Sequence, residues 1–160
     1  MRLNKKLIIG YFCIFVVCSF IFINPLNLRI QFNITNSLPD NFFITKAITN
    51  DTKLNIGDII SFPFVRDDRY YKKGTNFGKA ISCKEGQYLY VDKNKSFYCD
   101  GKLFTTALNV DSKGNKIDAF IWDGIIPKDK FFVLGSSLNS YDSRYWGFVD
   151  RKDIKGVVIW

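Results

Sequence analysis

The 160-residue sequence contains no histidine. Imidazole is the general base of Ser-His-Asp and Cys-His enzymes and a common zinc ligand, so those catalytic groups and imidazole-based metal sites are excluded. If the chain is a hydrolase, its proton acceptor must be a lysine, an aspartate or a glutamate. We therefore expect a site without a metal and without a cofactor.

Acidic residues are few: 15, against 23 lysines and arginines, which leaves a net charge of +8. The basic residues form no stripe with interleaved aromatic side chains, so the sequence predicts no nucleic-acid partner. Attraction to anionic lipid headgroups accounts for the same charge. With 47% hydrophobic and 17% aromatic residues, the composition also excludes a disordered chain.

Charge is missing entirely from Leu7 to Ile23. A spanning helix needs roughly 17–25 apolar residues, and the basic residues before this run favour a cytoplasmic N-terminus. A cleaved signal peptide is the alternative, but its apolar core is usually about 7–15 residues and precedes a small-x-small site, which the chain lacks after Ile23. We predict a cytoplasmic N-terminus and single-pass inner-membrane anchor at residues 1–25, and a periplasmic domain at residues 26–160.

The rest of the chain shows no sustained helical period. Residues 26–34 alternate apolar and polar side chains, which is typical of a strand, and Asp100-Gly101 between two apolar runs indicates a hairpin. Further strands are predicted at residues 59–65, 88–91, 96–99, 102–105, 130–135 and 156–160. We therefore expect an all-β fold of many short strands, preceded by one N-terminal transmembrane helix.

Only four cysteines are present, and Cys13 and Cys18 fall in the apolar run. Cys83 and Cys99 lie in the part predicted to be exported, where an even pair forms either a disulfide or two free thiols, and the oxidising compartment favours the disulfide. Two thiols without histidine do not make a zinc site, and a cysteine nucleophile would lack its usual base.

A serine activated by a lysine is one nucleophilic pair that the composition allows. Ser37 follows the apolar segment, and a lysine can take a serine proton only when it is neutral. Lowering a lysine pKa from about 10.4 to near 7 costs roughly 4 kcal/mol, which an apolar site supplies. Lys79 has apolar neighbours and no adjacent charge, whereas Lys84 is beside Glu85. The alternative is a strand-edge lysine that reaches water.

Two hydroxyls could complete such a site. Ser140 could accept a hydrogen bond from Lys79 and so orient its lone pair. Thr35 is two residues before Ser37, so in an extended chain the two side chains lie on the same side, and Thr35 could form an oxyanion hole with the backbone N–H of Ser37. Asp142 and Arg144 could instead form a purely structural ion pair.

The chain resembles the bacterial type I signal peptidase family, and most closely its TraF-type branch, the conjugal-transfer signal peptidases. Matching stretches run in the family's order: TNSLPDNFF, GDIISFPF, GKAISCKEGQ, YVDKNKSFYCDGK, IPKDKFFVLG and NSYDSRYWGFV. The chain departs from the usual pattern in three places. Ala80 follows the lysine where the family has arginine, residues 85–87 replace Pro-Gly-Asp, and residues 135–137 replace Gly-Asp-Asn.

The resemblance implies a Ser/Lys dyad with Ser37 as nucleophile and Lys79 as general base. It also implies that Ser140 orients the lysine, that Thr35 lines the oxyanion hole, and that Asp142 and Arg144 form a buried supporting pair. The expected substrates are exported precursor proteins cut after small residues near the lipid, with no metal and no nucleic acid involved. A conjugative pilin precursor, which some members cyclise, is the first expectation. A general secretory signal peptidase and a catalytically idle envelope assembly protein are the alternatives.

Overall fold

The structure is a computed structural model that describes residues 9, 11, 28–32 and 42–159. The anchor predicted at residues 1–25 therefore lies outside the described residues, apart from two positions. So do Thr35 and Ser37. Within the described part of the chain, no helix has the length and apolar character needed to cross a membrane.

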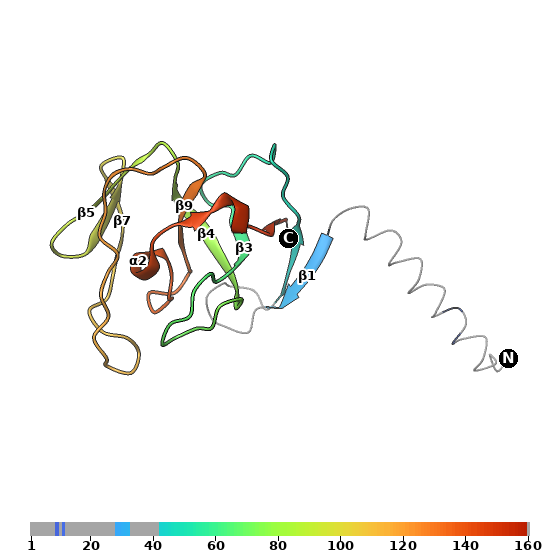
Figure 1. Cartoon of the computed structure of the whole chain (residues 1–160), viewed down its shortest axis with the longest axis horizontal. Coiled ribbons are helices and arrows are strands. Elements are labelled where there is room, and N and C mark those ends of the chain that lie inside the picture. The colour runs from blue at the N-terminus through green and yellow to red at the C-terminus, as the bar shows by residue number, and fades with distance from the viewer. Residues whose placement is uncertain (1–8, 10, 12–27, 33–41, 160) are drawn as a thin grey trace.

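The described part is mostly β, which confirms the coarse prediction from the sequence (Figure 1). Its strands are β1 (Leu28–Phe32), β2 (Phe42–Lys46), β3 (Ile59–Pro63), β4 (Asn76–Lys84), β5 (Tyr88–Val91), β6 (Ser96–Cys99), β7 (Lys102–Thr106), β8 (Asp123–Ile125), β9 (Lys130–Leu134), β10 (Val149–Asp150) and β11 (Gly156–Val158). One short helix, α2 (Ser143–Trp146), and one 3-10 turn, η2 (Arg151–Asp153), complete the described elements.

The strands form two sheets. The larger has seven strands in the order β1-β2-β11-β3-β4-β9-β10, and the smaller has four in the order β7-β6-β5-β8. All pairings between these strands are antiparallel. Pro63, which cannot donate to a ladder, closes β3 at its last residue. β1 and β5 lie toward opposite sides of the described chain in the view of Figure 1.

β4 is the strand that contributes buried side chains to both hydrophobic clusters of the described chain. Its alternate residues from Phe77 to Cys83 are buried, so one sequence pattern of period two places a row of side chains inside. The register against β9 shifts between Ile81 and Cys83, where two steps on β4 oppose one on β9. This bulge turns Cys83 away from the face that Ile81 occupies, because one extra residue reverses the side to which later side chains point.

Two hydrophobic clusters follow from that reversal. The first contains Ile81 together with Phe62, Phe77, Val133 and Trp146. The second contains Cys83 together with Leu89, Phe97, Ile126 and Phe132. Consecutive residues of β9 face opposite clusters, so β4 and β9 form the wall between the two cores.

Cys83 on β4 and Cys99 on β6 are joined by a disulfide with a Cα–Cα distance of 6.0 Å. The bond links the two sheets, because β4 belongs to the seven-stranded sheet and β6 to the four-stranded one. The bulge at Ser82 is what brings Cys83 to the side of the second cluster. The bond therefore ties the strand that carries Lys79 to the neighbouring sheet.

Removing the disulfide is expected to lower the free energy of unfolding by about 3 kcal/mol, since it closes a loop of 16 residues. The measurement is guanidinium unfolding of the Cys83→Ala/Cys99→Ala variant against the parent chain. A reducing agent should bring the parent chain to the stability of the variant and leave the variant unchanged. Equal unfolding midpoints for all four samples would contradict the prediction.

Candidate active site

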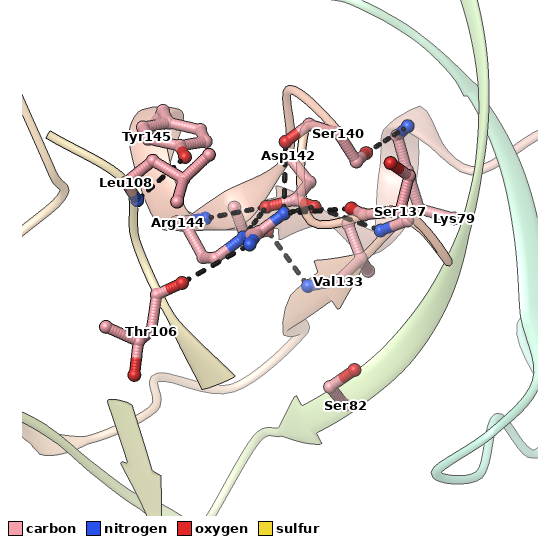
Figure 2. Close-up of polar contacts among 12 residues, drawn as sticks. Lys79, Ser82, Thr106, Leu108, Val133, Ser137, Ser140, Asp142, Arg144 and Tyr145 are labelled. Atoms are coloured by element: carbon pink, nitrogen blue, oxygen red, sulfur yellow. Dashed lines mark hydrogen bonds and ion pairs between the residues drawn. The ribbon is translucent and has the colours of Figure 1, made fainter. Parts of the chain in front are cut away.

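Lys79 lies in the middle of β4 with its side chain buried: 3% of the residue is exposed. Its partner across the ladder is Ile60 on β3, and its ammonium lies 5.4 Å from the centre of the Phe77 ring. The amine donates a hydrogen bond to the hydroxyl oxygen of Ser140 at 2.9 Å (Figure 2). A lysine in the middle of a strand is thus held away from water by apolar neighbours and one hydroxyl.

Burial lowers the pKa of Lys79 from 10.5 to about 8, because a charged amine loses its hydration there. The carboxylate of Asp142 acts in the opposite direction, and the guanidinium of Arg144 again lowers the pKa. These two charges oppose each other, so desolvation decides the direction. At pH 7 about a tenth of the amine is therefore uncharged and able to accept a proton.

Ser140 belongs to a turn that precedes α2. Its backbone N–H donates to the carbonyl of Ser137 at 3.0 Å, and its side chain is buried. Asp142 then caps α2: its side chain accepts a hydrogen bond from the backbone N–H of Arg144. Aspartate is favoured at this position because it satisfies an N–H that has no partner in the helix. The turn and the cap together fix the position of the Ser140 hydroxyl.

Asp142 and Arg144 form a buried pair beside this turn: Asp142 is 0% exposed and Arg144 is 2% exposed. Two parallel hydrogen bonds of 2.8 Å join the guanidinium to the carboxylate, from Nε to Oδ1 and from Nη2 to Oδ2. The remaining donors reach the backbone carbonyls of Thr106, Ser137 and Ser140 at 3.3, 3.4 and 3.1 Å. Figure 2 shows the guanidinium at the centre of this network. A buried pair is tolerated only when its lone pairs and protons are satisfied in this way.

Gly135 is a residue of the site that the sequence did not reveal. A Cβ atom at this position would lie 2.1 Å from the Ser140 hydroxyl oxygen and 3.2 Å from the Lys79 amine. Its backbone N–H donates to Asp142 Oδ2 at 3.0 Å. The available signal was a glycine directly after a buried strand, and that signal does not distinguish a close contact from an ordinary turn.

We expect the Gly135→Ala variant to lose about 1–3 kcal/mol of stability, because its methyl group needs the space that the Ser140 hydroxyl occupies. The displacement should also break the bond between Ser140 and Lys79. Guanidinium unfolding measures the first effect, and the pH titration of the Lys79 amine, followed by NMR, measures the second. Ser136→Ala, at the exposed next residue, is the control that should change neither. An unaltered Lys79 titration in Gly135→Ala would contradict the predicted displacement.

The strand edge beside Lys79 has a further property. β4 pairs with β3 from Asn76 to Ala80, but its pairing with β9 begins only at Ala80. Among the described strands, none pairs with the second edge of β4 between Asn76 and Lys79. A backbone edge of this kind can accept an extended peptide as an added strand.

The structure brings together four of the side chains that the sequence singled out: Lys79, Ser140, Asp142 and Arg144. It does not place Ser37 or Thr35, which belong to the segment between β1 and β2 outside the described residues. No group of three or more acidic or cysteine side chains suited to a metal occurs among the described residues. The described part of the site therefore consists of a desolvated amine, that of Lys79, oriented by the hydroxyl of Ser140.

Comparisons with known proteins identify the family of the chain. The family model described as "Signal peptidase, peptidase S26" matches residues 2–160. Signal peptidase I of Buchnera aphidicola subsp. Baizongia pistaciae is 58% identical over 36 residues, which are 22% of this chain and 12% of that protein. The chain thus aligns with only a small part of the length of this relative.

Two further comparisons extend over more of the chain. The inactive signal peptidase IA of Staphylococcus aureus strain COL is 28% identical over 165 residues, which cover 96% of this chain and 86% of the relative. A crystal structure of a signal peptidase I from Enterococcus faecalis V583 has a TM-score of 0.45 at 26% identity, and covers 66% of this chain and 97% of its own. Because the family model covers almost every residue, the chain belongs to the signal peptidase family, peptidase S26.

Proposed function

We propose that the chain is a serine endopeptidase with a Ser37/Lys79 dyad that cleaves exported precursor proteins. The observation that carries the proposal is the buried Lys79 amine, with its pKa lowered to about 8 and its hydrogen bond to Ser140. An amine in this state is the kind of base that a serine needs in a chain without histidine.

The reaction proceeds in two halves. The Ser37 oxygen attacks the carbonyl carbon of the scissile peptide bond while the neutral Lys79 amine takes the hydroxyl proton. Lys79 then gives that proton to the leaving nitrogen, the C–N bond breaks, and an ester remains on Ser37. Water attacks the ester with Lys79 again as base, or a substrate amine does so and closes a ring. The Thr35 hydroxyl and the Ser37 N–H stabilise the negative oxygen of each tetrahedral intermediate.

The remaining residues of the site position the base. The Ser140 hydroxyl accepts the Lys79 hydrogen bond, which leaves the amine's lone pair free to point elsewhere. Asp142 and Arg144 hold the turn that carries Ser140, because Arg144 donates to the Ser140 carbonyl. They act through Ser140 and touch no reacting atom.

We further propose that the substrate peptide binds along the edge of β4 between Asn76 and Lys79, where no described strand pairs with it. Backbone hydrogen bonds would fix the peptide, and the side chains on either side of the scissile bond would decide specificity. A signal-peptide-bearing precursor fits the family, and a conjugative pilin precursor is the finer proposal that rests on the TraF-type resemblance. The anchor at residues 1–25 and a periplasmic site at the lipid surface complete the proposed setting.

An idle protein of the same family is the second candidate. The observation in its favour is that the relative aligned over 96% of this chain is named an inactive signal peptidase. The buried lysine favours an active enzyme. A charged amine in an apolar site lowers the stability of the fold, and a protein without catalytic activity would gain nothing from it. A cleavage assay separates the two candidates.

The pH dependence of cleavage is the sharpest test of the dyad. Because only the neutral amine accepts a proton, kcat/KM should be half-maximal at about pH 8, where the folded Lys79 titrates, and should fall about tenfold per pH unit below it. The measurement uses the full chain in lipid vesicles and a signal-peptide-bearing precursor. Mass spectrometry of the product distinguishes a hydrolysed end from a cyclised chain.

Two variants control this assay. Ser37→Ala should cut nothing at any pH while remaining folded, and Ser112→Ala, at an exposed turn, should retain the parent profile. Cleavage by Ser37→Ala would eliminate the proposed nucleophile. The Lys79 amine, with a pKa of about 8, changes from mostly charged at pH 6 to mostly neutral at pH 9. A cleavage rate that stays constant over this range would therefore eliminate Lys79 as the base.

A further inference from the structure

The turn that carries Ser140 lies at the surface on one side, where Leu138 is 70% exposed. From within, Arg144 holds the turn through the backbone carbonyls of Ser137 and Ser140. The Ser140 hydroxyl meets the Lys79 amine at 2.9 Å, so a shift of the turn by about 1 Å would take the two atoms out of hydrogen-bond range. The position of the turn relative to β4 therefore decides whether the amine is oriented.

Tyr141, the residue after Ser140, ties this turn to the loop between β3 and β4. Its hydroxyl donates a hydrogen bond of 2.7 Å to Oδ2 of Asp68. The other oxygen of that carboxylate, Oδ1, accepts from the backbone N–H groups of Tyr70 and Tyr71 at 2.7 and 2.8 Å. Asp68 is thus fixed to its own loop while it holds Tyr141.

The same loop reaches the lysine through aromatic rings. The Tyr71 ring stacks on the Tyr141 ring, with centroids 5.8 Å apart and planes tilted by 21°. It also packs edge to face against Phe77 of β4 at 4.9 Å. The Phe77 ring lies 5.4 Å from the Lys79 amine. One loop therefore reaches both partners of the hydrogen bond between Lys79 and Ser140.

The charges at this contact stay constant while Lys79 titrates. Burial acts to raise the pKa of Asp68, but hydrogen bonds from Tyr141 and from two backbone N–H groups, together with the Arg66 guanidinium, hold the pKa below its usual range. Burial, followed by the hydrogen bond to Asp68, raises the pKa of the Tyr141 hydroxyl. The carboxylate remains charged and the hydroxyl remains protonated, so the bond between them persists.

We propose that Asp68, Tyr71 and Tyr141 position the lysine base by fixing the Ser140 turn against β4. We call these three residues the loop clamp. Packing of rings is not directional, whereas a hydrogen bond to a carboxylate fixes one atom in space. The loop clamp acts on the amine through Ser140 and touches no reacting atom. Its effect on cleavage rests on the proposed peptidase function, whereas its effect on the Lys79 amine does not.

Tyr141→Phe tests the proposal because it keeps the ring and removes only the hydroxyl. With the full chain in lipid vesicles and a signal-peptide-bearing precursor, we expect kcat at about pH 9.5 to fall about tenfold, with KM unchanged. The Lys79 amine is mostly neutral at that pH, so the loss reports its orientation and not its charge. Tyr70→Phe is the matched control. It also removes a hydroxyl bonded to an aspartate, Asp111, from a ring beside Tyr141, and it should keep the kcat of the parent.

The titration of the Lys79 amine, followed by NMR, gives a second readout that needs no cleavage. The Ser140 oxygen accepts a hydrogen bond from the amine and so favours its charged form. Tyr141→Phe should therefore lower the pKa of Lys79 by up to about one pH unit, and Asp68→Asn should shift it in the same direction. In a Ser140→Ala chain, adding Tyr141→Phe should have no further effect, because the loop clamp acts through that hydroxyl.

Three outcomes would overturn the inference. The first is a Tyr141→Phe variant with the kcat and the Lys79 pKa of the parent. The second is a higher KM with an unchanged kcat, which would place Tyr141 in contact with the precursor. The third is an equal shift of the Lys79 pKa with and without the Ser140 hydroxyl. If the parent chain itself cuts no precursor, the peptidase proposal fails, while the titration still decides the role of the loop clamp.

Discussion

Replacing Lys79 by methionine is expected to abolish cleavage and to make the protein more stable at pH 7. Methionine keeps the length and the apolar contacts of the side chain but has no amine to accept the Ser37 proton. We expect the rate of precursor cleavage to fall by at least about 1,000-fold, as it does when a member of a catalytic unit is lost. The same substitution removes a charge that the interior does not solvate.

The stability gain follows from the pKa of Lys79. The unfolded chain keeps the ordinary value of 10.5 and the folded chain has about 8, and at about 1.4 kcal/mol per pH unit this difference costs the folded state about 3 kcal/mol. The cost is fully present below pH 8, where both states bind the proton. It shrinks as the pH rises from 8 to 10.5 and is absent above that range.

We therefore expect guanidinium unfolding of Lys79→Met to show a large gain in stability at pH 6.5 and almost none at pH 10.5. The free energy of unfolding of Lys79→Met should be higher than that of the parent by up to about 3 kcal/mol at the lower pH, and by little at the higher pH. Lys73→Met, at an exposed loop position, is the control that should leave both cleavage and stability unchanged. A variant less stable than the parent at pH 6.5 would show that the lysine is not desolvated.

Replacing Asp142 by alanine is expected to lower the free energy of unfolding by about 3–5 kcal/mol. The substitution leaves the Arg144 guanidinium buried without its partner, and removal of one member of a buried pair has this cost. It also removes the cap of α2 and the acceptor of the Gly135 N–H. Chemical unfolding of the variant measures the loss.

A surface pair supplies the control for this prediction. Lys116 and Asp118 lie 3.6 Å apart with more than four fifths of each side chain exposed, so Asp118→Ala should change stability by less than about 0.5 kcal/mol. The Asp142→Leu/Arg144→Met double variant should be more stable than Asp142→Ala, since it leaves no buried charge. A loss below about 1 kcal/mol for Asp142→Ala would contradict the role given to the pair.

The parts of the fold that the sequence predicted are those with a local pattern. Asp100-Gly101 forms the hairpin between β6 and β7, and both residues have the positive φ, 49° and 78°, that such a turn requires. The apolar run predicted as a strand at residues 130–135 forms β9, which ends at Leu134. Each signal lies within a few neighbouring residues, so no knowledge of distant partners was needed.

Three of the elements that the sequence did not predict are short and depend on distant partners. β8 has three residues, including Gly124, and β10 has two, so neither is long enough to show alternation. They are strands because β5 and β9 lie beside them. α2 has four residues and no helical period, although Asp142 at its start is a recognisable cap.

The site shows the same division. Lys79 was singled out by its apolar neighbours in the sequence, and the roles of Lys79 and Ser140 came from the resemblance. Gly135 could not be predicted, because its importance comes from a contact with a side chain five residues later and with a strand more than fifty residues earlier. Nor could the bulge at Ser82, which depends on pairing with β9.

The close contact at Gly135 means that the residue at this position indicates whether a related chain can form the same hydrogen bond. Wherever a related sequence aligns to this strand and carries any side chain at that place, the hydroxyl and the amine that correspond to those of Ser140 and Lys79 have no room to meet. Such a chain would keep its nucleophile and its base in the sequence and still lack a working pair. The residue aligned with Gly135 therefore separates relatives with a working base from those without one, even where both carry the same reactive side chains.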